Sequence, residues 1–103
     1  MYQLNLPRYD IRISEQAGRR TILDVLRRKY VALTPEEWVR QHFVHFLIGH
    51  KGYPPALLAN EIELRSGSKR LRCDSVLYDS SLRPRMIIEY KAPTVAIQQK
   101  VFD

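Results

Sequence analysis

Three charged side chains stand inside stretches that otherwise have the composition of buried β-strands. Asp74 lies in the run 72–78, and Glu89 and Lys91 lie near the end of the run 84–93. β-branched, aromatic and apolar residues dominate both runs. Alternation of side chains along a strand places Glu89 and Lys91 on one face. Two carboxylates and an ammonium group are costly to bury unless they pair with each other or hold a metal ion, so the pattern predicts a charge cluster or a cation site.

The alternative is an exposed edge strand on which Glu89 and Lys91 form an ordinary surface ion pair. The surroundings favour the site. Residues 86–88 are Met-Ile-Ile, without polar alternation, which is typical of a central strand covered on both faces. Pro93 then ends the strand, so the charged residues lie at its carboxyl end, where open α/β sheets bind their ligands.

A helix is predicted to begin directly after Thr34. Thr34 is a favourable N-cap, Pro35 suits the first helical position, and Glu37 at the third position completes a capping box. The helix should end near residues 51–52, a Lys-Gly pair. Its apolar stripe consists of Val39, Phe43, Phe46 and Leu47.

The two neighbouring glutamates of this helix are expected to differ. Extending the apolar stripe back by one turn reaches Glu36 rather than Glu37. We therefore expect Glu37 to cap the helix, and Glu36 to face the interior, where it could pair with Arg40 or reach the site.

Strands and turns are predicted around this helix. An N-terminal hairpin is indicated by alternation at 9–13, a turn at 15–18 and an apolar run from residue 20. Residues 24–29 fit either a helical turn or a continued strand, and 66–68 fit a hairpin turn. Thr94 is expected to cap a second helix that carries Ile97 and Val101, and the sequence stops within it.

These elements predict one α/β domain over residues 1–103, with a mixed central β-sheet of four or five strands flanked by helices. Residues 1–29 would form an N-terminal hairpin extension, and 30–103 a core truncated at its C-terminal end. The strand with residues 86–91 should be central. Asp74 and Glu89 should project to the same side of neighbouring strands.

The charge balance favours a polyanionic partner such as nucleic acid, since the net charge is +6 and the pI is about 9.8. The densest basic clusters, 19–20 and 27–29, fit a solvated face better than a phosphate-binding patch. No apolar run has membrane-spanning length and no signal-peptide pattern is present, so we expect a cytoplasmic protein without a membrane partner. The single cysteine, Cys73, alternates to the face opposite Asp74 and is expected to be a small buried apolar residue.

The order of helix, hairpin with an aspartate, strand ending in Glu-x-Lys and helix resembles the PD-(D/E)xK nuclease superfamily. More specifically, residues 30–93 resemble the N-terminal nuclease domain of the R subunit of type I restriction enzymes. The Pro-Glu-Glu-x-x-Arg-Gln helix joined to Glu-x-Lys-Ala-Pro is the specific part of the resemblance. The matching pieces lie at 33–41, 52–54, 72–74 and 87–93.

The resemblance implies a restriction-endonuclease-like core and a metal-dependent DNA endonuclease. Asp74 and Glu89 would bind the metal, Lys91 would lie near the attacking water, and Glu36 would be the helix-borne acid. The partners implied are DNA, other restriction subunits and a C-terminal motor region. The basic side chains expected to contact nucleic acid are Arg40, Lys69, Arg70 and Arg72.

The chemistry of phosphodiester hydrolysis suits these residues. The reaction needs a cation that neutralises charge on the phosphate and lowers the pKa of a water. Mg²⁺, or Mn²⁺ in its place, takes one or two carboxylates plus waters and substrate oxygens, and the main-chain carbonyl of Tyr90 is a natural further ligand beside Asp74 and Glu89. Lys91 can orient the water and stabilise the transition state.

Two other readings stay open. The same fold could bind nucleic acid without cutting it. In a structural or assembly domain, Glu36, Arg40, Asp74 and Lys91 would form a buried ion network.

Overall fold

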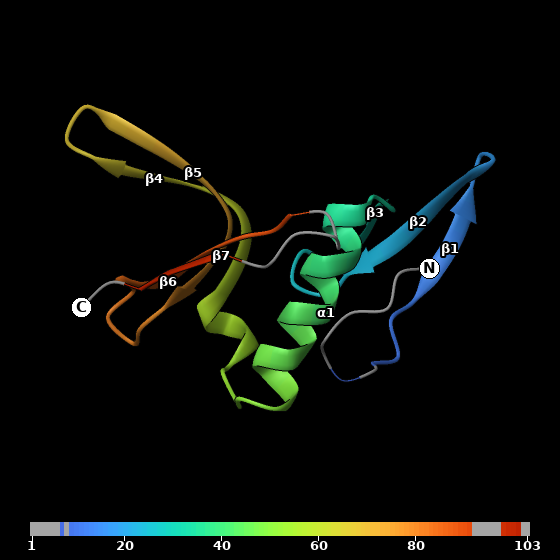
Figure 1. The fold of residues 1–103 in the computed structure, drawn as a ribbon, viewed down its shortest axis with the longest axis horizontal. Coiled ribbons are helices and arrows are strands. Elements are labelled where there is room, and N and C mark those ends of the chain that lie inside the picture. The colour runs from blue at the N-terminus through green and yellow to red at the C-terminus, as the bar shows by residue number, and fades with distance from the viewer. Residues whose placement is uncertain (1–6, 8, 92–97, 102–103) are drawn as a thin grey trace.

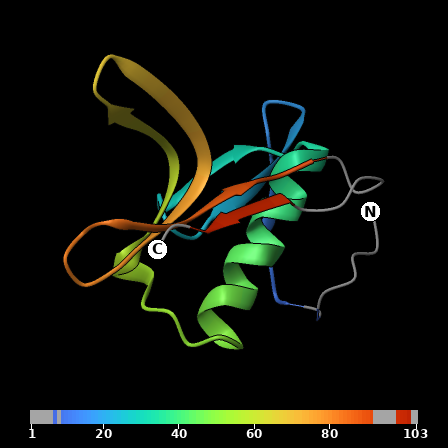
Figure 2. The same ribbon diagram turned by 60° about the vertical axis from the view of Figure 1, so that its left-hand side comes forward.

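The computed structural model describes residue 7, residues 9–91 and, for residues 98–101, the backbone. In this part of the chain two antiparallel sheets lie on either side of one α-helix (Figures 1 and 2). The predicted α/β class is therefore confirmed, but the predicted single mixed sheet is wrong. Short turns join β1 to β2, β2 to β3, β4 to β5 and β5 to β6, and such short connections allow only antiparallel pairing.

The first sheet has the order β1-β2-β3, with β1 at Ile13–Gln16, β2 at Arg19–Asp24 and β3 at Lys29–Ala32. The β1–β2 turn consists of Ala17 and Gly18, both with positive φ, as the tightest hairpins require. The predicted hairpin thus exists, but its first strand lies at 13–16 rather than 9–13. Residues 24–29 turn the chain into a third strand.

The second sheet has the order β4-β5-β6-β7. Its strands are β4 (Leu58–Ser66), β5 (Lys69–Tyr78), β6 (Pro84–Glu89) and β7 (Gln98–Val101), and a 3₁₀ helix, η1 (Pro55–Leu57), precedes them. β6 is an interior strand whose Ile87 and Ile88 are buried, which confirms the prediction of a strand covered on both faces.

The helix predicted after Thr94 is not formed at 98–101, because these residues pair with β6 as the antiparallel strand β7. An edge of β6 left open would expose a row of unpaired backbone groups, which a strand satisfies and a short helix does not. Residues 94–97 and 102 lie outside the described residues.

Helix α1 (Pro35–Gly49) packs against both sheets. One side carries Val39, Phe43 and Leu47 into a core with residues of the second sheet and its end: Leu58, Leu77, Ile88 and Tyr90. The other side meets β2 and the turn after it, where Val25 N–H donates to Gln41 Oε1 at 3.2 Å. No helix in the described residues is long and apolar enough to cross a membrane.

Candidate active site

Asp74 and Glu89 lie on neighbouring central strands, Asp74 within β5 and Glu89 as the last residue of β6. β5 and β6 pair up to Ser75 opposite Ile88, and Asp74 and Glu89 are the next residue of each strand beyond this paired stretch. Val76 and Ile87, which pair two residues away from them, are buried in one cluster with Cys73. The two half-buried carboxylates thus adjoin the paired, buried part of both strands.

The main chain of Tyr90, the residue between Glu89 and Lys91, holds the Asp74 carboxylate. Asp74 Oδ2 accepts the Tyr90 N–H at 2.9 Å. Asp74 and Glu89 are half-buried, Lys91 is exposed, and none of the three forms an ion pair with a described residue. The alternative of a Glu89–Lys91 ion pair is therefore not observed. Carboxylates that come close together without a cation repel each other.

The oxygen donors fit a hard divalent cation. Within the part of the chain that the structure describes, no three His, Cys, Asp or Glu side chains gather as a metal cluster. Two carboxylates and the nearby Tyr90 carbonyl leave room for water and substrate oxygens, which is the ligand set that Mg²⁺ takes. A cation shared by Asp74 and Glu89 would also remove their mutual repulsion.

Tyr90 anchors the end of β6 on the opposite face. Its ring is 4% exposed and lies in the α1 core, and its hydroxyl donates to Ser75 Oγ at 2.9 Å. Burial raises the pKa of Tyr90 far above its ordinary value, so the phenol stays a proton donor at neutral pH. Tyr90 is thus held twice, by its main-chain N–H on Asp74 and by its hydroxyl on Ser75.

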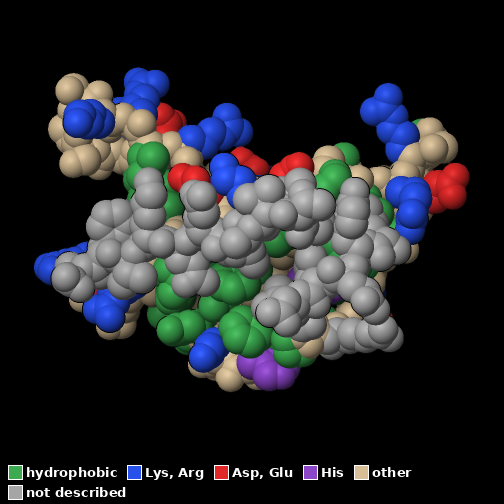
Figure 3. Space-filling model, viewed as in Figure 1, with side chains coloured by type: hydrophobic (Ala, Val, Ile, Leu, Met, Phe, Trp, Pro, Cys, Tyr) green, Lys and Arg blue, Asp and Glu red, His purple; other side chains and the backbone are tan. Residues whose placement is uncertain are grey.

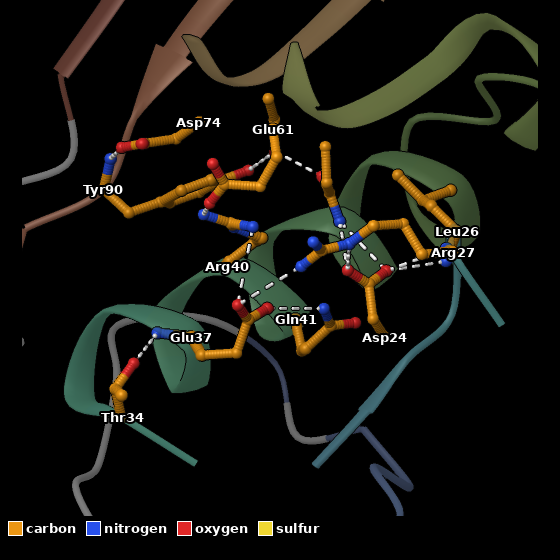
Figure 4. A network of polar contacts seen from close by, with 12 residues as sticks. Asp24, Leu26, Arg27, Thr34, Glu37, Arg40, Gln41, Glu61, Asp74 and Tyr90 are labelled. Atoms are coloured by element: carbon orange, nitrogen blue, oxygen red, sulfur yellow. Dashed lines mark hydrogen bonds and ion pairs between the residues drawn. The ribbon is translucent and has the colours of Figure 1, made fainter. Parts of the chain in front are cut away.

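A chain of buried hydrogen bonds continues from Tyr90 to the first sheet (Figure 4). Ser75 Oγ donates to Asn60 Oδ1, and Asn60 Nδ2 donates to both Asp24 oxygens at 3.1 Å. These bonds link the end of β6 to β5, β4 and β2. The N-terminal hairpin is therefore bonded to the strands of the candidate site.

Asp24 ends this chain as a fully buried carboxylate. It accepts the main-chain N–H groups of Leu26 and Arg27 at 3.0 Å each, and the Arg27 side chain. Burial on its own would raise the pKa of Asp24, but the hydrogen bonds from Arg27 and Asn60 outweigh it and hold the pKa below its usual range. Asp24 is therefore charged at neutral pH.

The predicted orientation of the two glutamates is reversed. Glu36 is exposed, whereas Glu37 is buried; its Oε2 accepts Gln41 Nε2–H at 2.8 Å and its Oε1 lies 3.4 Å from Arg40 Nη1. Because α1 is buried on two sides, its apolar stripe does not mark the only inward direction. Thr34 Oγ1 accepts the Glu37 N–H at 3.0 Å, so the predicted N-cap is confirmed.

The position of Arg40 also differs from its predicted role as a DNA contact. It is only 5% exposed, so it does not offer the exposed guanidinium that a DNA contact needs. Its Nη2 donates to Glu61 Oε1 at 2.7 Å, and its guanidinium lies 5.7 Å from the centre of the Tyr90 ring (Figure 4). Burial lowers the pKa of Arg40, but the hydrogen bond to Glu61 and the Glu37 charge raise it overall. Of the proposed ion network of Glu36, Arg40, Asp74 and Lys91, only Arg40 forms an ion pair with a described residue.

Glu61 is a site residue that the sequence analysis missed. It lies within β4 with φ of 56°, an uncommon conformation for a residue with a side chain. Its carboxylate bridges buried Arg40 and exposed Arg72, whose Nη2 lies 3.4 Å from Oε2. The hydrogen bond from Arg40 is the main reason that the pKa of Glu61 is lowered.

Asn60 and Ser75 were missed as well, although a signal existed. Each is a polar residue inside an apolar strand, the same pattern that singled out Asp74. The remaining predicted DNA contacts are exposed on β5: Lys69, Arg70 and Arg72.

The fold and the candidate site define an α/β protein with two half-buried carboxylates, Asp74 and Glu89, on the two central strands of its second sheet. Residues 35–103 match the family model of the type I restriction enzyme R protein N terminus. This is the greater part of the chain, which therefore belongs to that family, and the resemblance seen in the sequence is confirmed. No curated protein and no solved structure shows a significant match.

Proposed function

We propose that this chain is the nuclease part of a type I restriction system and hydrolyses DNA phosphodiester bonds with Mg²⁺ or Mn²⁺. The proposal rests on two half-buried carboxylates on neighbouring strands, Asp74 and Glu89, neither of which forms an ion pair with a described residue. Membership of the R protein family supports the restriction role. DNA, the other restriction subunits and a motor region are the proposed partners.

Each residue has a proposed task. Asp74 would offer the metal its Oδ1, because Oδ2 is held by the Tyr90 N–H, and Glu89 would bind from the neighbouring strand. The Tyr90 carbonyl would complete the protein ligands, and exposed Lys91 would orient the water. The bound cation supplies charge neutralisation and a more acidic water.

The second candidate is a nucleic-acid-binding module of the same family that does not cut. It is favoured by one observation: among the described residues, no third carboxylate joins Asp74 and Glu89 in a metal cluster. Such a module would bind DNA through its basic surface and show no metal-dependent hydrolysis.

Plasmid nicking with Mn²⁺ or Mg²⁺ separates these candidates, using Asp74→Asn and Glu89→Gln. Asn keeps an acceptor for the Tyr90 N–H, so the local fold is preserved while the metal ligand is weakened. Asp10→Asn, at an exposed carboxylate outside the strands, is the matched control. We expect the two site variants to lose on the order of 100-fold in rate and the control to lose nothing.

Thermal unfolding provides the second readout. Without metal, Glu89→Gln should be at least as stable as the natural chain, because the carboxylate repulsion is gone. With millimolar metal only the natural chain and Asp10→Asn should gain stability, by about 2.7 kcal/mol at 100 times the dissociation constant. Absence of both cutting and metal stabilisation in the natural chain would refute the nuclease proposal.

A further inference from the structure

Two β-hairpins project from the body of the molecule toward the same side (Figures 1 and 2). One is β1–β2 and the other is β4–β5. They lie at opposite ends of the longest axis, whose extent is 43 Å, and the end of β6 lies between them along that axis (Figure 1). The candidate active site is thus flanked by two arms.

The β4–β5 arm carries more positive charge than its own fold neutralises. Arg65 lies directly opposite Arg70, and like charges in such positions are destabilising. Glu63 offsets only Arg70, from 3.6 Å. Arg65 and Lys69 are exposed and form no ion pair with any residue that the structure describes.

The β1–β2 arm has the same property. Arg19 and Arg20 are exposed beside the turn, and neither forms an ion pair within the described ranges. Arg27, which belongs to the basic cluster at 27–29, instead forms an ion pair with Asp24. Figure 3 shows Lys and Arg side chains at the tips of both projections.

We infer that the two hairpins are phosphate-binding arms that hold one DNA duplex across the candidate active site. The choice of DNA rests on the proposed function. The arms lie at opposite ends of an axis whose extent, 43 Å, is longer than one turn of B-DNA, about 34 Å. A duplex is a stiff polyanion with one charge per about 1.7 Å, so it can neutralise both tips at once, which a short acidic peptide cannot.

The β1–β2 arm lies outside the region that matches the family model, because that region begins at residue 35. β1, β2 and β3 all precede it. The hydrogen bonds of Asp24 with Asn60 fix the first sheet to the second, so this arm is held in place relative to the site.

Salt-dependent binding of a duplex of about 21 bp, two helical turns, tests the inference. Binding is measured by fluorescence anisotropy in EDTA, so that it does not depend on cleavage. One variant is Arg19→Gln with Arg20→Gln, and the other is Arg65→Gln with Lys69→Gln. The control, Arg83→Gln with Arg85→Gln, removes the same charge from two exposed residues outside both arms, at the end of the β5–β6 loop and the start of β6.

Each arm variant should weaken binding on the order of tenfold and reduce the salt slope by about 2, and combining the two should reduce it by about 4. The control should change affinity by less than about threefold and leave the slope in place. Equal losses in the control, or an unchanged slope in either arm variant, would overturn the inference. Melting temperatures of all variants verify that they fold.

The two proposals fail in different ways. If Asp74-dependent nicking persists while arm variants bind DNA normally, the arms are refuted and the nuclease stands. If the arm variants lose binding while no chain cuts DNA, the arms stand and the nuclease fails.

Discussion

The first turn of α1 offers a matched pair of substitutions, because Glu36 is exposed and Glu37 is buried among Arg40, Gln41 and Arg27. Glu36→Gln should change the free energy of unfolding by less than about 0.5 kcal/mol. Glu37→Gln should cost about 1–3 kcal/mol, since it removes a charge that compensates a buried guanidinium. Urea denaturation measures both. Equal effects would mean that the helix orientation is wrong.

Asp24 makes stability depend on acid pH. Its folded pKa is lowered, so the unfolded chain binds more protons as the pH falls, and stability falls with it. The contribution is complete above the unfolded pKa, about 3.9, and is lost as the pH falls through the folded pKa. The pKa of Glu61 is lowered too, so it acts in the same direction.

Asp24→Asn is the corresponding test. At neutral pH it should cost about 3 kcal/mol, because a buried ion pair is broken. The difference from the natural chain should be constant between about pH 5 and pH 7 and should shrink below about pH 4. Urea denaturation across this range provides the measurement, and a difference that stays constant into acid would contradict the assignment.

Local sequence patterns identified some of the candidate site residues and missed others, for a physical reason. Asp74, Glu89 and Lys91 stand out because each interrupts an apolar run. The bonds that support them join residues far apart, such as Asp24 and Asn60, 36 positions away. No local pattern encodes such a pairing, and this is also why Glu37 was mistaken for a cap only.

Helices and turns were predicted best where the residues at their own ends determine where they begin. Thr34 and Pro35 fixed the start of α1, and Gly67, with φ of 63°, fixed the β4–β5 turn. The sequence predicts a helix where β7 forms, because a short segment with apolar residues four apart fits either a helix or a strand until a strand edge is available. Its partner β6 decides the matter.

The N-cap can be tested at the level of the element. Thr34→Ala should destabilise the chain by about 1 kcal/mol, because the Glu37 N–H loses its acceptor. Thr34→Ser retains the hydroxyl oxygen and should be close to neutral. Denaturant midpoints and far-ultraviolet circular dichroism report the two variants. A neutral Thr34→Ala would show that another group satisfies this N–H.

The whole molecule should unfold as one unit, although two sheets make it up. Asn60 and Glu37, which belong to the family-matched part, take partners from residues before position 35, namely Asp24 and Arg27. We expect residues 35–103 alone to lose several kcal/mol or fail to fold, because buried polar groups would be left unsatisfied.

Comparison of residues 35–103 with the full chain by urea denaturation and near-ultraviolet circular dichroism checks this expectation. The full chain should show one transition by both probes. Two separate transitions would mean that the first sheet is an independent attachment. It would then not hold its arm in a fixed position.

Cys73 precedes Asp74 by one residue, is fully buried and is the only cysteine of the chain. A thiol reagent can therefore reach the sulfur only when β5 opens. The modification rate thus reports how often β5 opens. Added Mg²⁺ or Mn²⁺ that binds Asp74 and Glu89 should slow the modification, whereas duplex DNA held at the arms alone should change it little. The single natural thiol thus reports whether a metal ion occupies Asp74 and Glu89, without any label being introduced.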